Sequence, residues 1–517
     1  MIWNPGNLQT YEDYRDALLD IINGGGVSEP SKPAIIQKPD ISERLVQTIW
    51  YEKQFRNRDM KTLSGKPVRV INSGRWNQES GPDFSAAEIE LDGNSIKGDV
   101  EIHVHAADWL RHDHDKNFDF NRCILHVFLF LDDDKIHDTL FDGSQMERLH
   151  LEPYLLADID TVKQTLTADD YHYSDEEHVG RCADVILHLD PDFLGKFLDF
   201  AGDRRIEEKA LRLSYQMSGE NYDQVFYQAL MTAMGYKGSK TLFFLLSKRA
   251  PLHDLMDFSH NKSLEDRILI IQSILFHVAN LIPSGSESYK EMDEETLAYV
   301  NQLNRWWIEL SGYFSDRVLP STKKWFAKVR PANFPTRRIA GIARMISKLA
   351  GKGRPVEGFV TLFRNGANAN LNRNEIRHFL KDLEDLLIVK EDPYWSYRFN
   401  FTSKKSSRKL TLIGKNRARS ILFNAILPMM LLKGRADSDR VLEDFTWKCV
   451  QNFPSLPDNV VLKFMRRRLF GGDDQAKNWV FNERRQQALF KIFYDCCNSN
   501  EVSCDDCYFY RQGVESL

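Results

Sequence analysis

The fold is decided by residues 81–105, which read GPDFSAAEIELDGNSIKGDVEIHVH. Apolar and polar residues alternate on both sides of Asp92-Gly93, a dipeptide that favours a tight hairpin turn. The stretch therefore predicts two antiparallel strands. If Asp92 and Gly93 form the loop, Asp83 lies opposite Ile102 on the second strand. If Gly93 and Asn94 form it, Asp83 lies opposite Val104.

The polar face of the second strand indicates chemistry rather than packing. Because side chains alternate along a strand, Asp99, Glu101, His103 and His105 share one face of it. The predicted register lets Asp83, Glu101 and His103 converge within roughly 5 to 8 Å. The alternative is an ordinary half-exposed strand pair with a solvated, charged outer face.

This arrangement resembles the PD-(D/E)XK nuclease superfamily, in which a Pro-Asp opens the second core strand and an acid, a spacer and a lysine lie on the third. Pro82-Asp83 matches the first element and Glu101-Ile102 the second, whereas His103 stands in the place of the lysine. The resemblance implies that Asp83 and Glu101 hold Mg²⁺ or Mn²⁺, which polarises the scissile phosphate and activates water. It also implies that Asp83, Glu101 and His103 are catalytic, although a neutral imidazole does not supply the lysine's fixed charge.

The flanking sequence fits the α-β-β-β-α-β order of that superfamily. The expected elements are a helix at 42–55, a strand at 67–71, the hairpin, a helix near 106–117 and an apolar strand at 123–131. The acid that the superfamily carries on its first helix could be Glu43 or Glu52. The expected fold class is α+β, with a nuclease-like α/β core followed by a large, mostly α-helical region.

Composition and periodicity divide the chain into four expected parts. These are a flexible N-terminal appendage (1–40), the nuclease-like α/β domain (41–150), a mostly helical, basic region (185–495) and a Cys-rich tail (496–517). The appendage contains one expected short helix, at 11–22. Within the helical region, residues 392–413 could hold a strand pair.

Charge is distributed unevenly along the chain. Residues 1–150 hold 17 Lys and Arg against 26 Asp and Glu, whereas residues 321–420 hold 23 against 7, a net charge of +16. We expect nucleic acid as the partner, because neutralising phosphates releases condensed counterions. The residues expected to contact it are Arg330, Arg337, Arg338, Lys404, Lys405 and Arg408. The alternative is a solvated basic surface that balances the acidic N-terminal third across a domain interface.

The C-terminus carries a second pattern that is typical of metal sites. Cys504 and Cys507 form a Cys-x2-Cys, and Cys497 precedes it by seven residues. We expect these three thiolates to bind Zn²⁺ or an iron-sulfur cluster. Cys496, Cys449 or a histidine could be the fourth ligand, and free structural cysteines are the alternative.

The histidines near the hairpin also permit a different enzyme. His103, His105 and Asp108 come close to the His-x-His-x-Asp-His set of metallo-β-lactamase-fold hydrolases. The spacing misses by one residue, and Trp109 occupies the place of the third histidine. We expect the nearby His112 and His114 to lie exposed on a polar helix. The helical remainder of the chain does not offer the further strands that this fold requires.

Over a longer span the chain resembles the bacterial family called domain of unknown function 2851. The residues that carry the resemblance include Ile49-Trp50, Gly74, Asn77, Gly81 to Phe84, Gly98 to His103, Asp108-Trp109, Ile124 to Val127, Asn333 to Pro335, Arg337-Arg338 and Gln486-Gln487. The resemblance covers nearly the whole chain from about residue 40. It implies no activity, so the function must be argued from the residues.

Composition limits the class of protein. The 517 residues are 42% hydrophobic and 28% charged, as in soluble globular proteins. No apolar run approaches the roughly 18 residues that a membrane span needs, and the first residues do not resemble a signal peptide. We expect a cytoplasmic protein of two or three domains without membrane contact.

Three functions of different classes follow from these patterns. The first is a Mg²⁺- or Mn²⁺-dependent nuclease with the basic region as its nucleic-acid platform. The second is a degenerate nuclease fold that binds nucleic acid without cutting it, which the missing lysine favours. The third is a structural or complex-forming protein whose basic segment docks an acidic protein surface.

Overall fold

The computed structural model describes residues 10–22, 41–77, 81–132, 138–166, 179–180, 182–217, 219–284, 289–327, 329–349 and 353–497. The chain divides into two compact units. The first unit consists of Met1–Gly202, Asp458–Val480 and Gln487–Leu517, and the second of Asp203–Pro457 and Phe481–Gln486. The class is α+β, as predicted, with a mixed sheet in the N-terminal part and a largely helical remainder.

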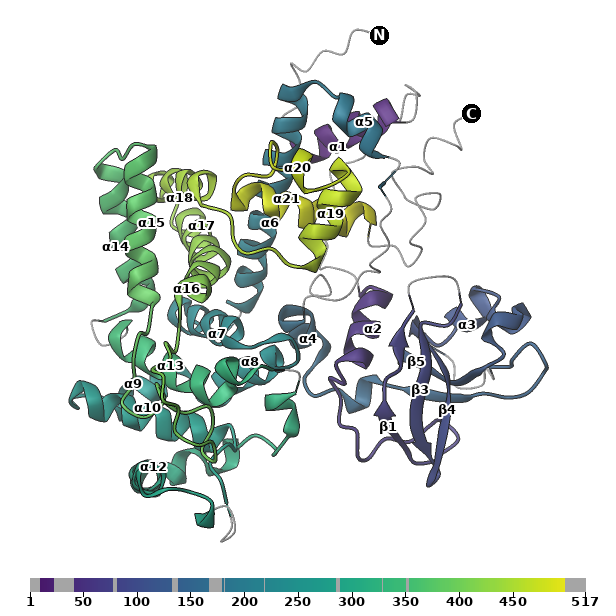
Figure 1. Cartoon of the computed structure of the whole chain (residues 1–517), viewed down its shortest axis with the longest axis horizontal. Coiled ribbons are helices and arrows are strands. Elements are labelled where there is room, and N and C mark those ends of the chain that lie inside the picture. Colours follow the sequence, from purple (N-terminus) through teal and green to yellow (C-terminus); the bar gives the residue numbers. More distant parts are fainter. Residues whose placement is uncertain are drawn as a thin grey trace. The chain divides into compact units, whose positions relative to one another are not determined.

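The sheet domain, which comprises residues 41–166, contains all named strands (Figure 1). Their bounds are β1 Val68–Asn72, β2 Arg75–Trp76, β3 Phe84–Leu91, β4 Asn94–His105, β5 Cys123–Phe130 and β6 Glu147–His150. The order is β1-β3-β4-β5-β6, and the short β2 also pairs with β3. The pairs made by β3 are antiparallel, whereas β4, β5 and β6 run parallel to one another.

The predicted hairpin turn is confirmed. Asp92 and Gly93 both have positive φ angles, 49° and 79°, as the two central residues of a type I′ turn require. Leu91 pairs with Asn94 across the turn, which is the register predicted for a loop at Asp92-Gly93.

A bulge near the start of β3 changes the register by one residue. Ala86 adopts a φ of 53° and donates its backbone N–H to Asp99 Oδ1 at 3.0 Å. Phe84 consequently pairs with Val100. The bulge places Asp83 beside Glu101 rather than directly opposite Ile102, and so sharpens the predicted proximity of the two acids.

A helix lies on each side of the sheet (Figure 1). The first is α2, Glu43–Tyr51, which begins after Ser42, whose hydroxyl accepts from Leu45 N at 3.3 Å. Its apolar side packs on the core of the sheet domain, which includes Val46, Ile49, Trp50, Val100, Ile102, Leu125 and Val127.

The second helix is much shorter than predicted. We expected one helix near residues 106–117, but α3 spans only Asp108–Arg111 and is followed by two 3-10 turns, His114–Lys116 and Phe118–Phe120. Asp113 ends the helical path with a φ of 56°. Trp109 is fully buried and packs with Phe120. The domain continues after β6 with α4, Ile159–Thr165.

The remainder of the first unit is helical. Its elements are α1 Tyr11–Ile22, α5 Cys182–His188, the first part of α6 Pro191–Gln216, α19 Val460–Phe470, α20 Asp473–Ala476, the part of α21 Glu483–Ile492 from Gln487 onward and a π-helix at Phe493–Cys497. Helix α1 was predicted with these bounds. Tyr11 and Tyr14 are buried in a cluster with Phe193 and Phe197, so this part of the expected appendage packs against other helices.

The second unit consists of packed helices around one large apolar core. Their bounds are α7 Tyr222–Met234, α8 Lys240–Arg249, α9 Leu252–Phe258, α10 Leu264–Val278, α12 Glu294–Phe314, α13 Pro335–Leu349, α14 Pro355–Asn368, α15 Arg373–Leu387, α16 Lys415–Ile421, α17 Leu427–Ala436 and α18 Arg440–Asn452. A π-helix at Leu422–Ile426 joins α16 to α17.

The strand pair expected within residues 392–413 is absent from the described structure of that segment. Only one bridge, between Val389 and Ile413, is present there. The segment instead folds around the guanidinium of Arg337, which donates to the carbonyls of Trp395, Arg398, Leu410 and Thr411. The two halves of the segment share a backbone hydrogen bond from Leu410 N to Ser396 O at 2.8 Å, while carbonyls on both halves are bound by the buried side chain instead of by a partner strand.

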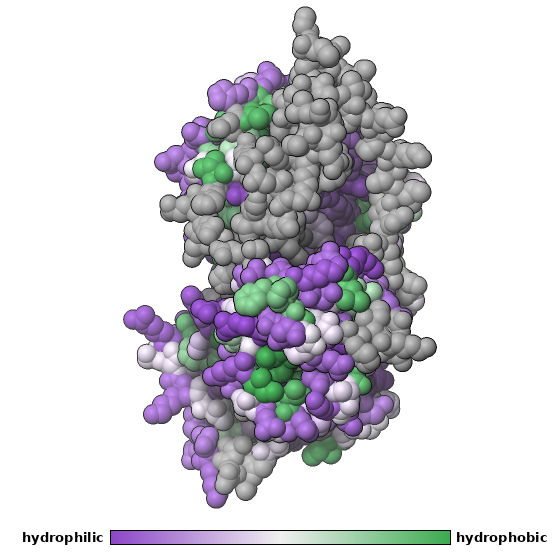
Figure 2. Space-filling model, turned by 90° about the vertical axis from the view of Figure 1, so that its right-hand side faces the viewer, coloured by the Kyte–Doolittle hydropathy of each residue, from purple (hydrophilic) through white to green (hydrophobic). Residues whose placement is uncertain are grey.

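Figure 2 shows one side of the molecule. Among the residues coloured there, hydrophilic ones predominate and hydrophobic ones form small groups. Phe118 and Phe141 are among the exposed apolar residues, and their rings pack edge to face with centroids 5.9 Å apart. None of the helices in the described ranges combines the length and apolar composition that crossing a bilayer requires.

Candidate functional site

The candidate site lies where β4 runs past the end of β3. Beyond Val100 the edge of β4 has no β3 partner, and Asp83 takes its place. Ile102 N donates to Asp83 Oδ2 at 3.0 Å, and Asp83 N donates to Glu101 Oε2 at 2.9 Å. This reciprocal pair of hydrogen bonds satisfies the open edge of the sheet and fixes the two carboxylates side by side.

Helix α2 contributes to the same point. Gln47, which is buried, donates through Nε2 to Asp83 Oδ1 at 2.7 Å and to Glu43 Oε1 at 3.2 Å. Of the two acids that the sequence left open, Glu43 is therefore the one near the site. Glu52 lies at the other end of α2, as its C-cap.

Two histidines face the second oxygen of Glu101. Glu101 Oε1 lies 3.3 Å from His114 Nε2 and 3.6 Å from His103 Nε2, and the two nitrogens are 3.2 Å apart. Ligand atoms about 2.1 Å from one ion are separated by about 3.0 Å in an octahedron and about 3.4 Å in a tetrahedron. The three atoms thus have the spacing of a ligand set for one divalent ion.

A buried relay sets the tautomer of His103. Asp138, paired with Arg148 at 3.2 Å, accepts from His126 Nδ1. His126 Nε2 then accepts from His103 Nδ1 at 2.9 Å. Because Nδ1 of His103 carries the proton, its Nε2 presents a lone pair toward Glu101, as metal-binding histidines do.

Aromatic side chains hold these imidazoles in place. Phe120 stacks on His114 with centroids 3.9 Å apart, and Trp109 packs against His114 and His126. His112 is exposed, and its ring nitrogen lies within 4.8 Å of those of His103 and His114. The cluster is therefore rigid on its buried side and open toward His112.

The surroundings change the protonation of the cluster. Desolvation and the charges of Glu101 and Glu43 raise the pKa of Asp83 well above its usual value, and desolvation likewise raises the pKa of Glu101. Desolvation lowers the pKa of His114 to about 4 and lowers that of His103 strongly. The histidines are neutral at pH 7 and can act as ligands, and a bound cation would offset the repulsion between the carboxylates.

Sequence reasoning missed His114, His126 and Asp138. We expected His112 and His114 to lie exposed on a polar helix, but the left-handed turn at Asp113 directs His114 inward. The available signal was His126, a polar residue inside the apolar strand β5, where a buried histidine needs a partner.

The set suggested by the metallo-β-lactamase comparison does not assemble. His105 turns outward and lies 2.8 Å from Asp132 Oδ1. Asp108 accepts from the backbone of His105 and pairs with Arg111. Trp109 is buried between histidines, so this alternative finds no support.

Two of the predicted nucleic-acid contacts require correction. Arg337 and Arg338 are only 1% and 6% exposed. Arg337 binds four carbonyls, and Arg338 donates to Asn333 Oδ1 at 2.5 Å. Buried guanidinium groups with these partners hold the fold and cannot reach a phosphate. Periodicity could not reveal this, because arginine seldom lies inside a core.

The other four predicted contacts are exposed. Arg330 precedes α13, and Lys404, Lys405 and Arg408 lie in the loop between Phe399 and Leu410. Lys405 is paired with Glu295 at 2.8 Å. The prediction that these residues bind nucleic acid stays open.

The predicted cysteine centre falls mostly outside the described residues. Cys504 and Cys507 lie beyond residue 497, where the described structure ends. Cys496 is buried at the end of the final π-helix, and Cys497 is half-buried beside it. The Zn²⁺ or iron-sulfur prediction therefore stays a prediction.

Comparison with known proteins identifies one family. The sequence of residues 43–458 matches the family described as protein of unknown function (DUF2851). The matched residues include the site and most of the helical unit. No curated protein and no solved structure matches the chain.

Proposed function

We propose that this chain, which belongs to the DUF2851 family, is a divalent-metal-dependent nuclease whose reacting centre comprises Asp83, Glu101, His103 and His114. The observation that carries the proposal is the triangle of Glu101 Oε1, His103 Nε2 and His114 Nε2, with sides of 3.2 to 3.6 Å. Mixed carboxylate and imidazole ligands of this kind are typical of catalytic centres for first-row divalent metals.

The ligand types favour a first-row transition metal over Mg²⁺. Magnesium is bound mainly by oxygen, whereas imidazole suits transition metals such as Fe, Ni, Cu and Zn, and Mn²⁺ is the member of that row that shares the preference of Mg²⁺ for carboxylates. When bound, such an ion polarises a phosphoryl oxygen and lowers the pKa of a coordinated water. Glu101 and the two histidines would hold it, and Asp83 is the next carboxylate along the edge.

The chain's own residues prepare the site for this role. Asp83 and Gln47 fix the position of Glu101 and of the β4 edge. Asp138 and His126 keep the lone pair of His103 directed at the centre. The order α2, β1, β3, β4, α3, β5 also fits the α-β-β-β-α-β core of the PD-(D/E)XK superfamily, if the short β2 is set aside, and this supports phosphodiester chemistry.

A second candidate function is binding of nucleic acid without cutting. His103 is fully buried and its pKa is lowered, so it does not replace the positive charge of the superfamily's lysine. That difference favours a fold that has kept its metal site or its nucleic-acid partner and has lost hydrolysis.

A nuclease assay separates the two candidates. Purified full-length protein would be incubated with single-stranded and duplex DNA and RNA in Mn²⁺, Mg²⁺ or EDTA. We expect Mn²⁺-dependent cutting that falls by orders of magnitude in Glu101→Gln and Asp83→Asn, because each change removes a charge from the centre.

The matched control is Glu90→Gln, which neutralises an exposed carboxylate on β3 that pairs with Arg69. It should cut as the unchanged protein does. Cutting that persists in EDTA or in Glu101→Gln would refute the proposed centre, and metal binding without any cutting would favour the second candidate.

A further inference from the structure

The second unit has a hollow lined by positive charge. It measures about 460 Å³ and lies among α15, α16, the end of α18 and residues 481–482. We call it the basic hollow, and its charged lining residues are Arg373, Arg377, Lys381, Lys415, Arg419 and Glu384. Five cations therefore face one carboxylate, beside the imidazole of His378.

Most of these cations have no counter-ion. Arg419 pairs with the buried Glu384 at 2.7 Å. Arg373, Arg377, Lys381 and Lys415 are exposed and form no ion pair with any residue in the described part of the chain. Other basic residues of this unit, such as Arg344, Arg364, Arg398 and Arg435, are paired with acids.

The arrangement works against the stability of α15. Arg373, Arg377 and Lys381 are spaced by four residues and so form one stripe of like charge, which is unfavourable in a helix. Arg373 is also the first residue of the helix, where the helix dipole disfavours a cation. A row of like charges and a cation at the start of the same helix are both unfavourable, and such a combination is expected where a bound ligand supplies the missing negative charge.

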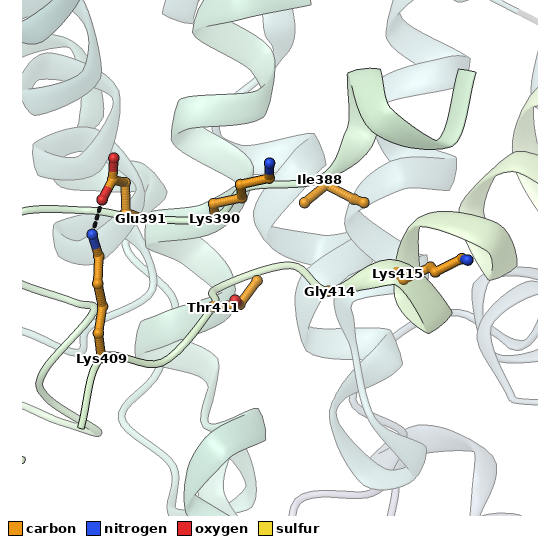
Figure 3. A pocket seen from close by; sticks show the side chains of 7 residues that line it. All are labelled: Ile388, Lys390, Glu391, Lys409, Thr411, Gly414 and Lys415. Atoms are coloured by element: carbon orange, nitrogen blue, oxygen red, sulfur yellow. Dashed lines mark hydrogen bonds and ion pairs between the residues drawn. The ribbon is translucent and has the colours of Figure 1, made fainter. Parts of the chain in front are cut away.

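A second hollow adjoins the first. It measures about 500 Å³ and shares Lys415 with the basic hollow. In Figure 3, Lys415 lies at one end, the Lys409–Glu391 pair lies at the other and Lys390 lies between them. Two adjoining hollows that both carry an excess of positive charge are suited to an extended polyanion rather than to one small anion.

An aromatic side chain stands at the basic hollow. Phe481 lines it and is 54% exposed, and the guanidinium of Arg485 lies 4.6 Å from the centre of its ring. Asn452 and Asn482 add amide groups nearby. A positively charged groove with an exposed ring is the usual combination for unpaired nucleotides, whose bases stack on aromatic side chains.

We propose that the basic hollow and its neighbour bind single-stranded nucleic acid, with phosphates on the stripe of α15 and on Lys415 and with a base on Phe481. The assignment deepens the proposed nuclease function by naming its substrate form, and binding at the hollow does not require that the sheet domain cut. A duplex keeps its bases stacked inside, so it cannot use Phe481.

Fluorescence anisotropy on the full chain tests the proposal. The probes are labelled single-stranded DNA and RNA of one sequence, their duplexes and inorganic polyphosphate, at several salt concentrations. The hollow variant is Arg373→Gln with Arg377→Gln and Lys381→Gln. Its matched control is Arg249→Gln with Arg305→Gln and Lys348→Gln, which removes the same number of exposed charges from α8, α12 and α13 of the same unit.

We expect the hollow variant to bind single strands at least about 10-fold more weakly, with a shallower salt dependence, and the control to stay within about 2-fold. Phe481→Ala should weaken single-strand binding about 10-fold and leave polyphosphate binding unchanged. Comparing the affinities for the single-stranded DNA and RNA probes shows which of the two nucleic acids is preferred.

Three results would overturn the proposal. These are loss of binding in the control but not in the hollow variant, equal affinity for duplexes, or an unchanged affinity in Phe481→Ala. Circular dichroism verifies that each variant is folded. Binding is measured without divalent metal and cutting with it, so loss of the nuclease proposal shows as absent cutting, whereas loss of this one shows as unchanged binding in the hollow variant.

Discussion

The polar cluster around Glu101 at the edge of the sheet and the basic hollow differ in how their charges are balanced. Around Glu101 and His103 almost every polar atom already has a partner inside the sheet domain. Around Arg377 and Lys381 the charges lie exposed without partners among the described residues. The first arrangement suits a small cation held by fixed ligands, and the second suits an extended anion.

The comparison shows that the role of a charged side chain depends more on whether it is buried or exposed than on its position in the sequence. Arg337 and Arg373 both belong to the basic segment, yet Arg337 is buried against four carbonyls and Arg373 is exposed. A buried charge must be satisfied by the fold, because desolvation is costly. An exposed, unpaired charge is free to bind something else.

The largest expected effect is a difference in the free energy of unfolding between variants of these two arginines. Arg337→Met should lower the free energy of unfolding by about 3 to 5 kcal/mol, because the carbonyls around it lose their donor while they stay buried. Arg373→Met should change it by less than about 0.5 kcal/mol. Chemical denaturation measures both values, and equal losses in the two variants would break the distinction.

The next effect concerns the relay behind His103. Asp138→Asn removes the carboxylate that orders the proton on His126, and so leaves the lone pair of His103 less well directed. The affinity for Mn²⁺ should fall about 10- to 100-fold. Isothermal titration of folded protein measures it, with Asp142→Asn, on the exposed loop that follows, as the control. An unchanged affinity would show that the relay is purely structural.

The smallest effect concerns the helix stripe. Arg377→Glu replaces two like-charge i,i+4 pairs on α15 by attractive ones. It should raise the free energy of unfolding by about 0.8 to 2 kcal/mol, because each pair loses a repulsion and gains an attraction of about 0.2 to 0.5 kcal/mol. The same change should weaken single-strand binding. A variant that is less stable as well as weaker in binding would mean that the stripe already has a structural role.

The local patterns of the sequence predicted a large part of the fold. The hairpin and its turn follow from Asp92-Gly93 and strict alternation, and α1 follows from periodicity. The bulge at Ala86 could not be predicted, because nothing in Ser85-Ala86-Ala87 requires it. The segment 392–413 was misread because its backbone carbonyls bind a side chain that is distant in sequence.

The candidate site was predicted only in part, because some of its residues are close in the sequence and others are brought together by tertiary packing. Asp83, Glu101 and His103 lie on one hairpin, so their proximity follows from local pairing. His114 reaches them through an irregular turn, and Asp138 does so through the relay across β5. Contacts of that kind depend on tertiary packing, which periodicity does not encode.

The most direct test of the metal centre is titration with Co²⁺ followed by visible absorption, which reports nitrogen and oxygen ligands around the ion. The unchanged protein should bind one Co²⁺ at this centre and develop the absorption bands of nitrogen and oxygen ligands, which differ from those of thiolate ligands. His105→Ala should do the same, since His105 faces Asp132 rather than the cluster. His114→Ala should lose the bands and bind at least about 100-fold more weakly, whereas an identical spectrum and affinity in His114→Ala would contradict the centre.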